Sequence, residues 1–116
     1  MRVMKLAALA AAGMLACRAT EPARGPATVY FSLDAPFCGL AMPVEFYVDS
    51  LLVGTDTFRI HLAPDHTTSR GFVAASGTHR LGARAVVGPG YYVWPDTVVS
   101  LGAGLTFTRS LPFYCS

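Results

Sequence analysis

Apolar and polar residues alternate along most of the chain after residue 27, with the period of two that is typical of β-strands. Val44, Phe46 and Val48, for example, alternate with residues of more polar character, and a similar pattern runs from Leu81 to Val87. Glycine, proline, aspartate and serine lie between these runs, as they do in turns. The pattern predicts seven strands, at residues 28–33, 43–49, 57–62, 70–75, 78–87, 91–100 and 105–114.

Many short strands separated by turns are typical of a β-sandwich or a barrel. We predict an all-β fold, a small antiparallel β-sandwich formed by residues 28–116. A sandwich is favoured because two sheets of this size can cover each other's apolar faces. Pro95 lacks a backbone donor, so the strand at 91–100 is expected to lie at a sheet edge or to be interrupted there.

The N-terminal residues follow a different pattern from the rest of the chain. Two basic residues precede an apolar run from Leu6 to Ala16, and Cys17 follows directly. A basic start and a short apolar run are typical of an export signal. With the cysteine directly after it, the segment 1–16 resembles a bacterial lipoprotein signal peptide. The resemblance implies that Cys17 is fatty-acylated, with chains such as palmitate, and becomes the mature N-terminus.

The apolar run is eleven residues long, whereas a helix that crosses a bilayer needs about 20. The run is therefore too short to be a lasting membrane anchor by itself. Two alternatives to lipidation stay open: cleavage nearby, for instance after Ala19, which would release a soluble secreted protein, and retention of the uncleaved segment. Residues 17–27 hold two prolines and no large apolar side chain, and we predict a lipidated cysteine followed by a disordered tether.

The mature chain is predicted to be electrically neutral. Two of the nine basic residues lie in the signal segment, and the remaining seven arginines balance the seven acidic residues. The arginines are scattered, whereas nucleic-acid binding requires clustered contacts to phosphates. We therefore expect no nucleic-acid partner. No lysine follows the signal segment, which excludes lysine-based nucleophilic chemistry in the mature chain.

Three cysteines are an odd number for an exported protein. Lipidation of Cys17 accounts for one of them and leaves Cys38 and Cys115 as a pair. Outside the cytosol such a pair stays oxidised, so we predict a disulfide between Cys38 and Cys115. The alternative is two buried free thiols.

Three segments carry a family resemblance. Residues 44–55 combine alternating apolar positions with an aspartate turn and a Val-Gly pair, residues 76–81 open a strand after a Ser-Gly turn, and Gly102-Ala103-Gly104 precedes the last strand. Together they resemble a PEGA-type repeat over residues 44–111. The resemblance implies an immunoglobulin-like or transthyretin-like sandwich, related to carboxypeptidase regulatory domains, that serves exported bacterial proteins as a surface or spacer module without catalysis.

Few residues are candidates for chemistry. His61, Asp65 and His66 have side chains that zinc accepts, but their positions on an outward strand face and in a loop favour solvated surface residues over a metal site. The segment Ser76–His79 is explained as a turn that opens a strand, and the chain lacks the Gly-x-Ser-x-Gly motif of one class of hydrolases. Glu45 alternates outward and lacks a partner carboxylate for glycoside cleavage. We predict no enzyme activity, no catalytic or metal site and no cofactor.

The most suggestive cluster is Tyr91-Tyr92-Val93-Trp94, which follows a Gly-Pro-Gly turn. On a strand, Tyr92 and Trp94 share one face, and Tyr91 and Val93 share the other. If the first face is exposed, Tyr92 and Trp94 form a flat platform for sugar rings or for a protein. If it is buried, Trp94 is the central aromatic residue of the core.

These observations favour a non-catalytic lipoprotein of the bacterial cell envelope, on the outer membrane or at the periplasmic face of a membrane. Its partners would be the membrane, through the lipid, and an envelope protein, with the sandwich as a structural or interaction module. The alternative is a small carbohydrate-binding or ligand-binding module that uses Tyr92 and Trp94.

Overall fold

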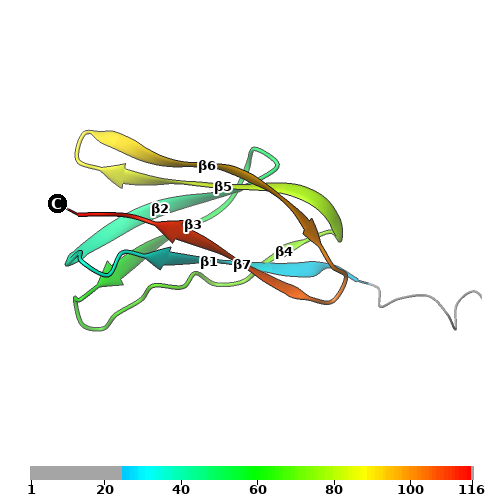
Figure 1. Ribbon diagram of the computed structural model, residues 1–116, viewed down its shortest axis with the longest axis horizontal. Helices are drawn as coiled ribbons and strands as arrows, with labels where there is room; N and C mark the ends of the chain where they lie inside the picture. The colour runs from blue at the N-terminus through cyan, green and yellow to red at the C-terminus, as the bar shows by residue number, and fades with distance from the viewer. Residues whose placement is uncertain (1–24, 116) are drawn as a thin grey trace, which may run out of the picture.

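A computed structural model describes residues 25–115, and the predictions for the signal segment, for Cys17 and for most of the tether lie outside the described residues. The strands are β1 (Ala27–Asp34), β2 (Leu40–Val48), β3 (Leu51–Ile60), β4 (Phe72–Ala74), β5 (Gly77–Val87), β6 (Gly90–Leu101) and β7 (Thr106–Pro112). They form a three-stranded sheet in the order β4-β1-β7 and a four-stranded sheet in the order β3-β2-β5-β6 (Figure 1). The predicted all-β sandwich of seven strands is confirmed.

The hairpin between β2 and β3 has a two-residue turn. Asp49 and Ser50 both adopt left-handed backbone conformations, with φ of 52° and 69°. Positive φ at both positions matches the twist of the flanking strands, so the second strand begins directly after the turn. β3 therefore begins at Leu51, and the predicted start at residue 57 is wrong. The apolar pattern is irregular there because the ladder shifts its register between Phe46 and Tyr47.

Two prolines lie where the sheet tolerates them. Pro43 is part of β2, which pairs with β3 over its full length but with β5 only from Val44 onward, so Pro43 has a neighbour on one side only. Pro95 lies in β6, at the edge of the four-stranded sheet, where the register with β5 shifts between Leu81 and Ala83. The prediction that Pro95 marks an edge strand or an interruption is confirmed.

One strand pair departs from the predicted antiparallel arrangement. β1 and β7 run parallel, from the pair Thr28 and Thr106 to the pair Asp34 and Pro112. Each strand reverses the direction of the one before it, so the first and the seventh run the same way. They are neighbours because the chain crosses from β6 in one sheet to β7 in the other, which places the last strand beside the first (Figure 1).

The core lies between the sheets and is centred on phenylalanines. Phe31 of β1 stacks on Phe46 of β2 with 4.6 Å between ring centroids, and Phe58 and Phe72 pack edge-on or tilted around them. Phe31 and Phe46 come from different sheets, so their contact joins the two layers. Burial of one such side chain contributes about 1.5–3 kcal/mol to the hydrophobic stabilisation.

The predicted disulfide is confirmed. Cys38, in the loop between β1 and β2, is bonded to Cys115, which follows β7, and their Cα atoms are 5.4 Å apart. Cys38 is buried. The bond fixes the end of the last strand to the loop that follows the first.

The segment that leads into β4 is less regular than predicted. The strand predicted at 70–75 is shortened to Phe72–Ala74. The preceding residues still follow β1, because the amide of Leu33 donates to the carbonyl of Thr67 and the amide of Ser69 donates to the carbonyl of Phe31. The buried hydroxyl of Ser69 accepts a hydrogen bond from the amide of Phe31, which takes the place of a regular ladder bond.

Candidate functional site

Trp94 belongs to the core. Its side chain faces inward from β6 and is 3% exposed, and its indole Nε1 donates a hydrogen bond to the carbonyl oxygen of Pro112. The Tyr92 ring stacks on it with 5.0 Å between centroids and is only partly exposed. Of the two interpretations of this cluster the core one is correct, and the exposed platform of Tyr92 and Trp94 is wrong.

The other face of the same strand is the exposed one. Tyr91 is 57% exposed and Val93 is 60% exposed, because their side chains point away from the core. Three further exposed apolar residues lie on this outer face of the four-stranded sheet, and we call the five together the outer patch: Leu52, Val86, Tyr91, Val93 and Val98. The alternation of residues along β6 shows which side chains share a face. The position of the Trp94 indole shows which of the two faces is buried.

Four side chains on this outer face form a connected network, and one of them, Tyr91, belongs to the outer patch. Arg84 of β5 donates from Nε to Oε1 of Glu45 on β2, and the hydroxyl of Tyr47 donates to the same oxygen over 3.0 Å. The Arg84 guanidinium also lies 4.1 Å from the centroid of the Tyr91 ring, in cation–π geometry. The network therefore connects β2, β5 and β6 on the outer face.

The network favours the charged forms of its ion pair. The hydrogen bond from Arg84, and next the one from Tyr47, lower the pKa of Glu45 below its usual value. The same bond to Glu45 raises the pKa of Arg84. Partial burial, and next the carboxylate of Glu45, raise the pKa of Tyr47. Glu45 and Arg84 are thus a fixed, neutralised pair, whereas the sequence pattern indicates only that Glu45 points outward.

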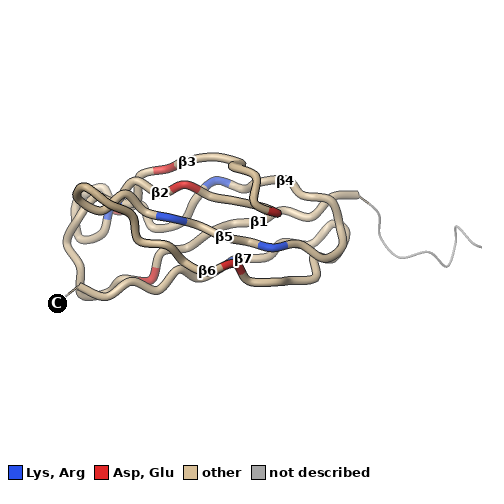
Figure 2. The backbone as a smooth tube through the Cα atoms, turned by 90° about the horizontal axis from the view of Figure 1, so that it is seen from above, with Lys and Arg blue, Asp and Glu red and all other residues tan. Residues whose placement is uncertain are grey.

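The outer face of the three-stranded sheet differs in chemistry. Its residues on β1 and β7 alternate outward in register and carry mainly hydroxyl groups: Thr28, Tyr30, Ser32, Thr106, Thr108 and Ser110. Val73 of β4 is the large exposed apolar residue on this sheet. Figure 2, which looks onto the four-stranded sheet, shows acidic and basic positions distributed along its strands. The two faces therefore differ in both apolar and charged content.

The histidines are held by neighbours instead of facing one another. Nδ1 of His61 is 2.7 Å from the carbonyl oxygen of Cys38, and Nε2 of His66 is 2.7 Å from Oδ2 of Asp56. Residues 25–115 contain no group of three potential ligands that could hold a metal ion. Asp65, His61 and His66, the candidate set for zinc, are therefore not brought together as a metal site.

His79 has both ring nitrogens in use. Nδ1 lies 2.6 Å from Oδ2 of Asp49 and Nε2 lies 2.7 Å from the carbonyl oxygen of Ala75. The bond to Asp49, and next the one to Ala75, raise the pKa of His79. Neither partner of His79 is the hydroxyl of Ser76, and the two bonds brace the turn that opens β5.

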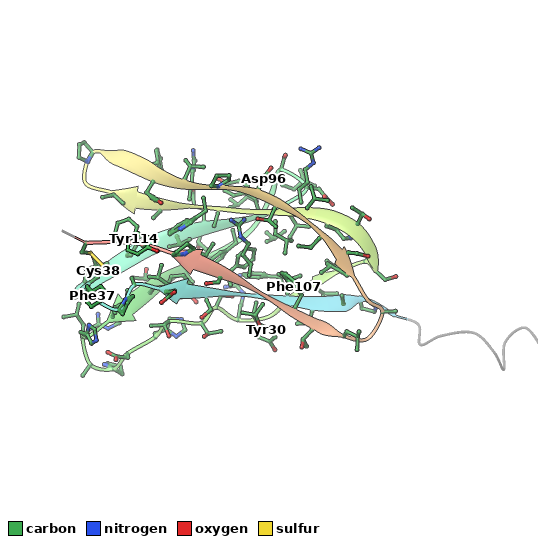
Figure 3. The ribbon with its side chains drawn as sticks, in the orientation of Figure 1. Tyr30, Phe37, Cys38, Asp96, Phe107 and Tyr114 are labelled. Carbon is green, nitrogen blue, oxygen red and sulfur yellow. A yellow bond between two sulfur atoms is a disulfide. The ribbon has the colours of Figure 1, made fainter. Side chains whose placement is uncertain are left out.

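Two aromatic residues flank the disulfide at one end of the sandwich. Phe37 is 81% exposed and Tyr114 is 78% exposed, and each precedes a bonded cysteine in the chain. Both lie at the end opposite to the start of β1, close to Cys38 (Figure 3). The disulfide fixes the backbone next to both rings.

No family model, curated protein or solved structure matches the chain. Residues 25–115 contain no helix that is long and apolar enough to cross a membrane. The features of the chain that point to a function are Cys17, the disulfide and the outer face of the four-stranded sheet.

Proposed function

We propose that the protein is a non-catalytic lipoprotein of the bacterial cell envelope, in which lipid-modified Cys17 anchors a β-sandwich that acts as a structural or protein-interaction module. The observation that carries the proposal is the position of Cys17 directly after the apolar run of residues 6–16. The resemblance of residues 44–111 to a PEGA-type repeat agrees with a surface or spacer role.

The disulfide supports export. Bonded cysteines persist in oxidising compartments and are rare in the cytosol. Because Cys38 and Cys115 are bonded to each other, Cys17 is the odd cysteine of the chain and is available for acylation. Several acyl chains on one cysteine give stable anchoring, whereas a single chain binds a membrane only marginally.

The arrangement of the ends also supports anchoring. β1 begins at Ala27 at one end of the sandwich, and the disulfide lies at the other (Figures 1 and 3). A tether before β1 would hold the first end toward the membrane. The strands would then project away from it, with their two sheet faces open to partners.

The test is the chemistry of the mature N-terminus. The full chain is expressed in a bacterial host, membrane and soluble fractions are separated, and the N-terminal peptide is analysed by mass spectrometry. We expect an acylated peptide that begins at Cys17 in the membrane fraction, and no acylation in the Cys17→Ser variant. An unmodified soluble chain that begins at Thr20 would refute the proposal.

A further inference from the structure

The ion pair at the centre of the outer face has a self-complementary placement. Glu45 and Arg84 are directly opposite each other on the neighbouring strands β2 and β5, and both point outward. A two-fold axis that runs parallel to the strands, between β2 and β5, would lay each β2 over β5 of a second copy. Glu45 of each copy would then face Arg84 of the other, so this pair would oppose no like charges.

We infer that this outer face is the interface of a symmetric homodimer. This inference deepens the proposed function, because it names the partner of the anchored interaction module as a second copy of this chain. In an isologous contact the same patch serves both subunits, so the patch must complement itself in charge. The adjacent, oppositely charged Glu45 and Arg84 meet that condition.

The composition of the face fits an interface. Aromatic residues and arginine are enriched at the centres of protein interfaces, and Tyr91, Tyr47 and Arg84 lie together here. The rest of the outer patch supplies exposed aliphatic side chains around them. The hydroxyl-bearing face of the three-stranded sheet lacks this combination and is suited to solvent.

The size of the face fits a weak dimer, of the kind that two copies anchored in one membrane can form. Four strands of 9 to 12 residues, about 4.8 Å apart, make a face of roughly 600 Å². Stable interfaces cover about 800 Å² on each partner, with weaker ones below that. Face-to-face packing of sheets is also the arrangement of the two layers of this fold.

The axis is compatible with membrane anchoring. Rotation about an axis parallel to the strands leaves the start of β1 at the same end in both copies. Both tethers would therefore reach the same membrane. An axis perpendicular to the strands would send the two tethers in opposite directions, and it would not pair Glu45 with Arg84.

Two other uses of this region fit less well. Pairing of two β6 edges is obstructed at the register shift around Pro95, which lacks a backbone donor in the middle of the strand. Stacking of a sugar ring on Tyr91 would compete with the Arg84 guanidinium, which already lies over that ring. Face-to-face contact of two copies does not use the backbone edge of β6, and it leaves Arg84 over the Tyr91 ring.

The test uses full-length chains with two different affinity tags, co-expressed in one bacterial cell and solubilised in detergent. Capture through one tag measures how much of the other follows. We expect wild-type copies to co-purify. When both tagged copies carry Glu45→Arg, or both carry Arg84→Glu, like charges face each other. We expect the affinity between the copies to fall by about tenfold or more in each case. Glu45→Arg paired with Arg84→Glu is expected to restore it.

A second pair of variants tests the interface independently, in case the charge variants misfold. Val93→Arg places a charge in the outer patch and is expected to abolish association. Val73→Arg makes the same change at an exposed valine of the three-stranded sheet and is expected to leave association unchanged. Circular dichroism and thiol labelling confirm that each variant keeps its fold and its disulfide.

Sedimentation in density-matched detergent gives the mass of the assembly, with a dimer expected. A wild-type mass of one chain, or association that survives both Arg84→Glu and Val93→Arg, would overturn the dimer. So would failure of the oppositely charged variants to restore association. None of these outcomes bears on the N-terminal peptide, whose acylation tests the lipoprotein proposal separately.

Discussion

The indole Nε1 of Trp94 donates a hydrogen bond to the carbonyl oxygen of Pro112, over 2.7 Å. Trp94 belongs to β6 in the four-stranded sheet, and Pro112 ends β7 in the three-stranded sheet. The bond therefore joins the two layers, close in the chain to the Cys115 half of the disulfide. Trp94, a candidate for a ligand platform from its sequence pattern, is thus a structural link between the sheets.

Replacement of Trp94 by phenylalanine removes this bond. The Pro112 carbonyl loses its partner, and the smaller ring leaves unfilled volume, so we expect the free energy of unfolding to fall by about 1–3 kcal/mol. Urea unfolding followed by far-ultraviolet circular dichroism measures the change. Tyr91→Phe, on the exposed face of the same strand, is the control and is expected to change stability by less than about 0.5 kcal/mol. Equal losses in both variants would contradict the assignment.

Trp94 is the single tryptophan of the chain, so its emission reports on this site alone. Because the indole is 3% exposed, we expect blue-shifted emission that resists quenching by iodide or acrylamide in the native protein. Unfolding should shift the emission to longer wavelength and make it accessible to the quencher. Emission typical of a solvated indole in the native state would contradict the buried placement.

The disulfide is expected to be a large contributor to stability. Cys38 and Cys115 are 77 residues apart, and a bond that closes a long loop restricts the unfolded chain strongly. Replacement of both by alanine is expected to lower the free energy of unfolding by about 2–5 kcal/mol. Guanidinium unfolding measures this change, and addition of a reductant to the wild type should reproduce it.

Cys17→Ser is the control for the cysteine replacement, because it removes a thiol without opening the loop. It is expected to leave the unfolding midpoint unchanged. If native, unreduced protein with Cys17 replaced still reacts with a thiol reagent at two sites, the bond is absent. The same result would remove one support for an extracytoplasmic location.

Alternation and turn chemistry predict much of this fold, because both are local. The runs around Phe46 and Leu81 alternate over most of their length, and their strands lie close to the predicted positions. The start of β3 is missed because the register shift opposite Phe46 interrupts the alternation. The parallel pairing of β1 with β7 depends on which sheet receives the last strand, and no local pattern encodes that choice.

The candidate site is harder to predict than the fold. Glu45 and Arg84 are 39 residues apart in sequence, and only the pairing of β2 with β5 brings them together. Which face of β6 is buried depends on the packing of Trp94 against Pro112, which is also a long-range contact. A sequence pattern gives the two faces of a strand, whereas the assembled sheets decide which one faces the core.

His79 and Asp49 make stability depend on pH in two separate ranges. The bonds of His79 to Asp49 and Ala75 raise the pKa of His79 above 6.5. The contribution of protonated His79 to the free energy of unfolding is therefore complete below pH 6.5 and is lost as the pH rises through the folded-state pKa. The amide of Arg80, and next His79, lower the pKa of Asp49 below 3.8. The contribution of Asp49 is present above that value and is lost as pH falls through its folded-state pKa.

Chemical unfolding across the pH range measures this dependence. We expect a decline on the alkaline side that His79→Gln reduces, because that variant cannot carry the proton. Asp49→Asn is expected to reduce both the alkaline and the acidic decline, since Asp49 takes part in both. An alkaline decline of unchanged size in His79→Gln would show that another group is responsible.

Gly54 provides a test of packing between the two sheets. A Cβ atom at this position of β3 would lie 2.5 Å from Cε1 of the Phe72 ring and 2.6 Å from Nη2 of Arg70. Phe72 is a buried core residue, so it cannot move away freely. Gly54→Ala is therefore expected to lower the free energy of unfolding by about 1–3 kcal/mol, measured by urea unfolding.

Gly39→Ala is the matched control for Gly54→Ala. A Cβ atom there would meet nothing within 4 Å, and the backbone of Gly39 is not in the left-handed region. Replacement is expected to leave stability unchanged or to raise it by up to about 1 kcal/mol, because alanine restricts the unfolded chain. If Gly54→Ala changes the free energy of unfolding no more than Gly39→Ala does, Phe72 does not pack against β3 as described. The sandwich would then be more open between β3 and β4 than the contact between Gly54 and Phe72 indicates.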